Sequence, residues 1–158
     1  MNAEIEIYSK YIRKQIAEIH AALKGLSEEQ LNQRPDVSGA NIGYVIATHV
    51  LGNARAWILG IACGQPLRRD RPGEFASSGT YEELGKTACT LSGEIDAVLA
   101  ELDPSTLGDR LSPSQELWGE GETQEITCRE ALAHVLEHAS MHLGQIQLTA
   151  DLIRGQSG

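Results

Sequence analysis

The chain has 158 residues, a length that suits one domain and leaves little room for two. It carries 13 basic and 22 acidic side chains, and the resulting formal charge of −9 disfavours binding to a nucleic acid or to an anionic membrane surface. Hydrophobic residues make up 41% and aromatic residues only 4%, so we expect an ordered core built mainly of aliphatic side chains. Residues 1–158 are therefore expected to form a single domain.

The sequence carries no sign of export. Residues 1–6 lack the basic and apolar regions of a signal peptide, and no run approaches the ~18 consecutive apolar residues of a membrane span. The three cysteines, Cys63, Cys89 and Cys128, are odd in number, widely spaced and without a C-x-x-C pair. We interpret them as partly buried thiols in a reducing cytoplasm, with a nucleophilic cysteine as the alternative.

The first half of the chain predicts two long helices. Apolar residues recur at steps of three and four over 2–24, and Ser27 with Gln30 forms a capping box for a short helical turn. A second helix is expected over 40–62, ended by Gly64. Residues 65–78 hold the one basic cluster, around Arg69, and are interpreted as a solvated loop, with recognition of an anionic substrate as the alternative.

The second half predicts two more helices. One begins at Thr80 with Glu83 completing a capping box and stops before Pro104, and the other runs from Thr127 to about Arg154. The connection 105–126 is rich in Ser, Gly, Pro and Glu, and short extended pieces are expected around 117–118 and 123–126. Four helices of matched length predict an all-α four-helix bundle, and the two long connections predict one long crossover.

The last helix carries a stripe of histidines. His134, His138 and His142 lie four residues apart, which places them on one face, and apolar residues such as Met141 and Leu148 lie beside or along this stripe. The opposite face is polar and includes Glu137. The three imidazoles are therefore expected to point inward.

Inward imidazoles need partners, because an unsatisfied buried polar group costs about 1–3 kcal/mol. A bound metal ion satisfies several neutral imidazoles at once, and two histidines four residues apart can share one ion. His49, on the apolar face of the second helix, adds a further candidate ligand, whereas His20 is interpreted as an ordinary surface residue. Spacing alone does not choose between the pairs His134/His138 and His138/His142.

Two segments carry a family resemblance. Residues 41–49 form a Gly-aromatic-apolar run ending in histidine, and residues 138–146 read H-x-x-x-H-x-G-Q-I. In order and separation they resemble the DinB/YfiT-like family of metal-dependent enzymes, and the four-helix pattern fits over essentially the full chain. The second motif is the more specific. Leu143 departs from the pattern, since many relatives have arginine there.

The resemblance implies a four-helix bundle with a divalent metal ion held by three histidines. Because Gly and Gln follow His142, the ligands carried over are His49, His138 and His142. Four further residues are expected to line the pocket or support the ligands: His134, Asn53, Trp57 and Gln145. The ion is expected to be zinc or nickel, with iron, manganese and copper also open.

Three hypotheses follow for the function. The first is a metal-dependent enzyme acting on small molecules, either a transferase that uses a low-molecular-weight thiol or a hydrolase, since three protein ligands leave room for water or substrate. The second is a non-enzymatic metal- or ligand-binding bundle of the stress response. The third is a structural bundle with an incidental histidine stripe. No general base is evident: Glu116, Glu120, Glu122 and Glu125 could each fold over the site. The resemblance also implies a homodimer.

Overall fold

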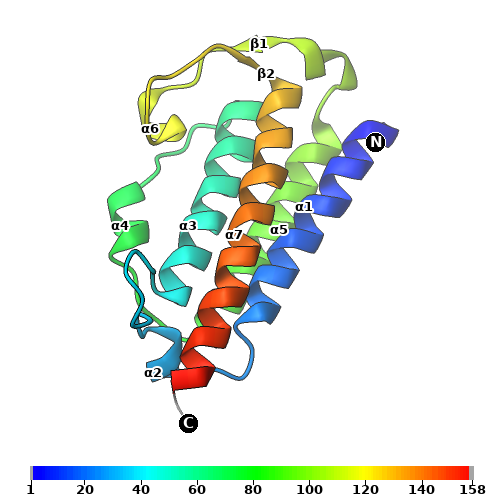
Figure 1. The fold of residues 1–158 in the computed structure, drawn as a ribbon. Helices are drawn as coiled ribbons and strands as arrows, with labels where there is room; N and C mark the ends of the chain where they lie inside the picture. Colours follow the sequence, from blue (N-terminus) through cyan, green and yellow to red (C-terminus); the bar gives the residue numbers. More distant parts are fainter. Residues whose placement is uncertain (1, 157–158) are drawn as a thin grey trace.

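Four long helices pack side by side in the computed structural model, which describes residues 2–156. The predicted all-α bundle is confirmed (Figure 1). Its long helices are α1 (Ala3–Ala22), α3 (Gly43–Arg55), α5 (Tyr81–Glu101) and α7 (Cys128–Gln156). One apolar cluster, made mainly of aliphatic side chains from all four helices, fills the space between them, as the low aromatic content predicts.

The helix starts predicted near Asn2, Ser27 and Thr80 are present, whereas the helix expected from residue 40 begins at Gly43. The side chain of Asn2 accepts a hydrogen bond from the backbone N–H of Glu4 at the start of α1, and Ser27 forms its capping box at α2 (Glu28–Leu31). Thr80 and Glu83 form the capping box of α5. Each cap satisfies backbone N–H groups that have no partner within the helix, so these boundaries are set by local chemistry.

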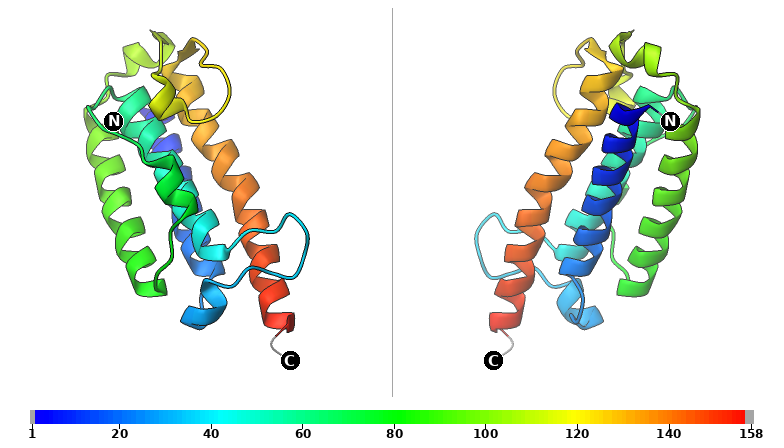
Figure 2. Two further views of the ribbon diagram at one scale, coloured as in Figure 1. Left: turned by 90° about the vertical axis from the view of Figure 1, so that its left-hand side faces the viewer. Right: turned by 90° about the vertical axis from the view of Figure 1, so that its right-hand side faces the viewer.

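The helices are connected with one crossover, as the sequence predicts. Helices α1 and α7 run in one direction and α3 and α5 in the other (Figures 1 and 2). The chain therefore returns along the whole bundle between α3 and α5, over residues 63–80. Each of α1 and α3 packs against both α5 and α7. The helices α3 and α7, which carry the candidate metal ligands, are therefore antiparallel neighbours.

The connection between α5 and α7 folds across one end of the bundle (Figure 1). Its elements are η2 (Pro104–Gly108, a 3₁₀ helix), β1 (Arg110–Leu111), α6 (Gln115–Trp118) and β2 (Ile126–Thr127). The strands pair antiparallel, with Arg110 opposite Thr127. The extended piece expected at 117–118 is wrong, because Ser114 caps a helical turn there. Of the extended piece expected at 123–126, only the last residue, Ile126, lies in a strand, β2.

The second predicted helix changes type near its end. From Ala56 to Ala62 it continues as a π-helix, η1, in which the N–H of Cys63 donates to the carbonyl oxygen of Ile58 five residues earlier. Apolar periodicity does not reveal such a widened turn, and π-helical turns are frequent beside functional sites. Here η1 carries Trp57.

The interpretation of residues 65–78 as a solvated loop is wrong in its centre. Asp70 caps a short helix, α4 (Arg71–Phe75), which lies against α3. The side chains of Arg69 and Glu74 are only 3% and 8% exposed. The two opposite charges neutralise each other, which permits a burial that neither residue type predicts on its own.

Three smaller expectations are also corrected. His20 is half-buried rather than an ordinary surface residue: its ring stacks on that of Tyr81 at 3.9 Å, and its Nε2 lies 3.1 Å from the Tyr81 carbonyl oxygen. Met141 and Leu148, expected along the inward stripe, are 63% and 62% exposed. Cys89 is exposed rather than partly buried; all three thiols are free.

The segment Gly43–Ala62 is long and apolar enough by composition to cross a membrane. In the structure, 83% of its most apolar window is buried inside the bundle. This degree of burial is typical of the central helix of a folded core, and it accounts for the continuous apolar character of the segment.

Two isoleucines on α1 provide a matched test of the core. Ile12 is 0% exposed and Ile7 is 56% exposed. We expect Ile12→Ala to lower the free energy of unfolding by about 2–5 kcal/mol, because it removes buried methyl groups and leaves a cavity. Ile7→Ala should change it by less than about 0.5 kcal/mol. Denaturant unfolding followed by circular dichroism measures both, and equal effects would contradict this packing of α1.

Candidate metal centre

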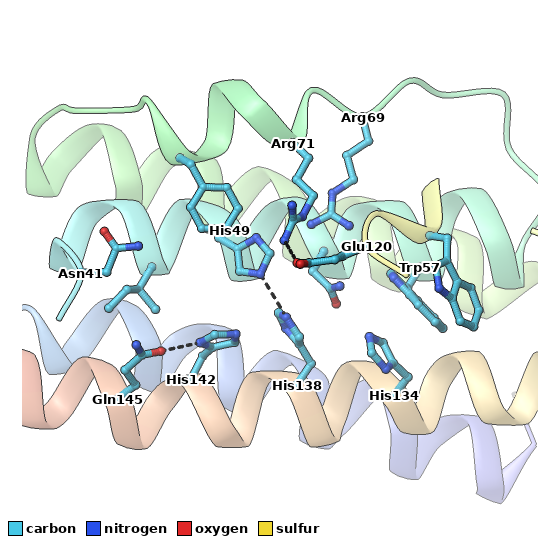
Figure 3. A pocket seen from close by; sticks show the side chains of 14 residues that line it. Asn41, His49, Trp57, Arg69, Arg71, Glu120, His134, His138, His142 and Gln145 are labelled. Carbon is cyan, nitrogen blue, oxygen red and sulfur yellow. Dashed lines mark hydrogen bonds and ion pairs between the residues drawn. The ribbon is translucent and has the colours of Figure 1, made fainter. Parts of the chain in front are cut away.

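The site is built from two helix faces that oppose each other. Along α3 and η1, His49, Asn53 and Trp57 follow at steps of four, and along α7 the histidines 134, 138 and 142 do the same. Since the helices are antiparallel, His49 faces the His138–His142 end and Trp57 faces His134 (Figure 3). Residues spaced four apart on each helix therefore face residues spaced four apart on the other helix across the space between them.

Three histidines come together at one end of this row. The Nε2 atoms of His49 and His138 are 3.2 Å apart, and one ligand atom from each of His49, His138 and His142 lies within 4.8 Å of the others. The ring centroids of His138 and His142 are 4.4 Å apart. His134 is set back, with its centroid 5.6 Å from that of His138. The structure therefore groups the pair His138/His142 with His49.

Two of these imidazoles have a partner on the far side of the ring. His49 Nδ1 is 2.9 Å from Oε2 of Glu74, and His142 Nδ1 is 2.7 Å from Oε1 of Gln145. A carboxylate or amide oxygen there accepts the Nδ1–H and leaves the Nε2 lone pair directed at the centre of the group. His138 Nδ1 is buried without a partner.

Glu74 is the anchor of this arrangement. Its carboxylate also accepts two hydrogen bonds from the Arg69 guanidinium, at 2.8 and 3.0 Å. Burial raises the pKa of Glu74, but the hydrogen bonds from His49 and Arg69 and the charge of Arg69 outweigh burial, so its pKa is lowered. The side chain is therefore an ionised acceptor that fixes the orientation of His49.

The three histidines of α7 favour the neutral form. Burial, followed by the charges of the neighbouring histidines and Arg69, lowers the pKa of His138 to about 3. Burial also lowers the pKa of His142, against the opposing effect of Gln145, and lowers that of His134. Neutral imidazoles are the form that binds metals.

The donor set fits a metal ion. Two nitrogens that each lie about 2.05 Å from a tetrahedral ion are roughly 3.3 Å apart. The observed separation of 3.2 Å between His49 and His138 agrees with this value. The outer-ring partners of His49 and His142 also match the usual surroundings of metal-ligating histidines.

A cavity of about 570 Å³ opens beside the three histidines. The residues expected from the sequence to surround the site all line it: His134, Asn53, Trp57 and Gln145. At the end away from His142, the Trp57 ring stacks on that of His134, with ring centroids 3.7 Å apart. The Trp57 and Trp118 ring centroids are 4.9 Å apart. The cavity is large enough for a small molecule to lie against the candidate metal ligands.

The crossover and the end connection supply residues that sequence reasoning missed. Glu74 and Arg69 were not singled out as supports of His49, and Phe75 packs on His49 with ring centroids 4.8 Å apart. Of the four glutamates left open in the end connection, Glu120 lines the cavity, where it pairs with Arg71 at 2.7 Å. The Arg cluster was a visible signal, but no spacing linked it to His49.

The fold and site define a helical bundle with a three-histidine candidate metal centre. A family model described as the DinB superfamily matches residues 11–146, so the chain belongs to the DinB superfamily. No curated protein matches the chain by sequence. The resemblance inferred from residues 41–49 and 138–146 is thereby confirmed at the level of the superfamily.

Gly52 tests the placement of Glu74. A β-carbon at Gly52 would collide with the Glu74 carboxylate, so Gly52→Ala must displace it from His49 and Arg69. We expect a loss of about 2 kcal/mol in the free energy of unfolding, because the Arg69 guanidinium is left buried without its partner. Gly93→Ala is the matched control, since a β-carbon there meets nothing within 4 Å. Equal stability of both variants in thermal unfolding would show that Glu74 does not occupy this position.

Proposed function

We propose that the protein is a metal-dependent enzyme acting on small molecules, with His49, His138 and His142 holding one divalent ion. The observation that carries the proposal is the convergence of three imidazoles on the wall of a cavity. A structural zinc site is closed by four protein ligands, whereas three leave a position for water or substrate. Imidazole ligands favour zinc or nickel here, with iron, manganese and copper as further candidates.

The ion would supply Lewis acidity, which lowers the pKa of a water or thiol at its open position. Around it, Glu74 holds His49 in one tautomer and orientation, and Gln145 does so for His142. The aromatic side chains of Trp57 and Trp118 line the far end of the cavity, with their ring centroids 4.9 Å apart. These contacts keep the ligand atoms in place before a substrate arrives.

The reaction we propose is thiol transfer or hydrolysis. If the nucleophile is a thiol, it comes from a small molecule, because none of the three cysteines lines the cavity. Burial, and then the neighbouring Cys128, raise the pKa of Cys63 to about 11, and burial raises that of Cys128. For hydrolysis, Glu120 is the one carboxylate among the described residues that line the cavity, and we assign it the role of proton acceptor.

The main alternative is a metal- or ligand-binding bundle without catalysis. The cavity beside the three histidines supports the enzyme over a bundle that only stores an ion, since such a bundle needs no space for a substrate. A homodimer and a cytoplasmic location remain predictions from the sequence. The exposed apolar residues Met141 and Leu148 on α7 support an interface of that kind.

Metal analysis tests the site directly. We expect the purified chain to retain one ion per chain after incubation with Zn²⁺ or Ni²⁺ and dialysis. Inductively coupled plasma mass spectrometry measures this metal content. His138→Ala should retain less than a tenth of that, because two ligands cannot close the site. Saturating metal at ~100 Kd should stabilise the wild-type chain by about 2.7 kcal/mol in thermal unfolding, and a chelator should remove this gain.

His20→Ala is the matched control for this experiment. His20 packs against Tyr81 between α1 and α5 and does not line the cavity. Its replacement should leave the metal content at one ion per chain. Wild-type protein without stoichiometric metal, or equal metal loss in both variants, would overturn the proposed site.

A further inference from the structure

Two arginines line the cavity, and their partners differ in burial. Arg69 is paired with Glu74, and the side chains of this pair are only 3% and 8% exposed. Arg71 is paired with Glu120, whose side chain is 82% exposed, while that of Arg71 is 33% exposed. Apart from histidines, these two arginines and Glu120 are the charged lining residues among residues 2–156. Arg69 is therefore held by a buried partner, whereas Arg71 is paired with a carboxylate that lies mostly in water.

The two ion pairs also differ in geometry. Arg69 donates from Nε and from Nη2 to the two carboxylate oxygens of Glu74, which is the two-bond arrangement that a guanidinium favours. Arg71 donates to Glu120 through one hydrogen bond, from Nη2 to Oε2 at 2.7 Å. An exposed pair of this kind adds little to stability, because water screens it and two long side chains must be ordered. A second carboxylate that accepted two hydrogen bonds from Arg71 would therefore displace Glu120.

Arg71 lies within reach of the histidine centre. Its guanidinium carbon is 5.0 Å from the ring centroid of Phe75, and that ring is 4.8 Å from the ring of His49. Stacking on an aromatic ring orients a guanidinium and supplements its charge interactions. Figure 3 shows Arg71 pointing from α4 toward the cavity. One small molecule can thus contact the histidines with one end and Arg71 with the other.

Glu120 belongs to a segment that can take up other conformations. It lies between Gly119 and Gly121, which have φ angles of +98° and +79°. Glycine reaches more backbone conformations than any other residue, so a change in this segment meets little steric resistance. A β-carbon at Gly119 would lie 3.3 Å from atoms of both Arg69 and Arg71, so this segment passes directly against the two arginines. Glu120 can therefore leave Arg71 without unfolding a helix.

The other polar residues at this part of the cavity are neutral. Asn53, Trp57 and His134 line the cavity, and each has a buried side-chain atom without a hydrogen-bond partner among the described residues. Such dipoles bind polar groups but do not balance a negative charge. For an anionic group of a ligand, Arg71 is the cation in this cavity whose present partner can be exchanged.

We propose that Arg71 selects ligands that carry a carboxylate, and that Glu120 occupies the same guanidinium when no ligand is bound. The ligand carboxylate accepts two hydrogen bonds from Arg71, and Glu120 is released. The inference rests on the proposed function in one respect, because it identifies the ligand as the substrate, a small carboxylic acid whose other end lies at the histidine centre. Once released, Glu120 remains beside the cavity as the proton acceptor assigned above.

The test uses dicarboxylates as probes. Both tryptophans of the chain line the cavity, so intrinsic fluorescence reports on bound ligands. After repletion with Zn²⁺, the chain is titrated with malonate, succinate and glutarate, in which the two carboxylates are increasingly far apart. The half-amide of the tightest binder is titrated as well, since it keeps one carboxylate for the zinc ion and is neutral at its other end. The zinc content of every sample is measured.

Four variants separate a role in binding from a change in net charge. Arg71→Gln should raise the Kd of the tightest diacid about tenfold, because the charge-assisted hydrogen bonds are lost, and should affect the half-amide much less. Arg68→Gln is the matched control: it removes the same charge from an exposed arginine that does not line the cavity, and the Kd should not change. Arg71→Lys keeps the charge without the planar fork and should give an intermediate Kd. Glu120→Gln should lower the Kd about threefold, because the competing carboxylate is removed.

The outcomes distinguish this inference from the proposed function. One zinc ion per chain with the same diacid Kd in Arg71→Gln and Arg68→Gln overturns the role of Arg71 alone. A Kd that depends on Arg71 in a chain that holds no zinc supports the role of Arg71 and overturns the metal site. Weaker binding to Glu120→Gln than to the wild-type chain overturns the competition between Glu120 and the ligand. Failure of all three diacids to bind the wild-type chain overturns the carboxylate subsite.

Discussion

The antiparallel packing of α3 against α7 is the constraint on which the site depends. Each helix presents polar side chains at steps of four, and the register of the pair decides which of them meet (Figure 3). In this register His49 lies 3.2 Å from His138, and Trp57 stacks on His134. A shift of one helical turn, about 5.4 Å, would move His49 away from its position beside His138 and His142 and would separate Trp57 from His134.

The crossover between α3 and α5 does more than connect parallel helices. It spans the length of the bundle, and its helix α4 packs against α3. This packing buries Glu74 beside His49. Gly52 provides the space for that carboxylate, since any β-carbon there would collide with it. A surface connection thus becomes the support of one candidate ligand, and Arg69 makes the burial of its charge tolerable.

The cavity divides into two ends with different chemistry. At the histidine end, ring nitrogens of three histidines lie within 4.8 Å of one another, and a divalent ion held there would add positive charge that attracts an anionic atom such as a thiolate or hydroxide. At the aromatic end, the unpaired polar atoms are neutral, and the nearby guanidinium is already balanced by Glu74.

The sequence by itself determined the four long helices, the capping boxes at Ser27 and Thr80, and the candidate ligands. Apolar residues at steps of three and four mark the buried faces, Thr80 and Glu83 mark a helix start, and the H-x-x-x-H-x-G-Q-I segment marks two of the three histidines. These features are local, because each depends on residues within one or two helical turns. The choice of His142 over His134 came from the family resemblance rather than from spacing.

Only the tertiary structure decided which distant residues complete the site. Glu74 lies 25 residues from His49, and Glu120 lies 49 residues from Arg71, and no local pattern ties either pair together. The π-helical turn that carries Trp57, the burial of Arg69 and the half-burial of His20 likewise depend on what packs against them. Burial of a charged or polar side chain is set by its partners, and those partners are known only once the helices and their connections are in place.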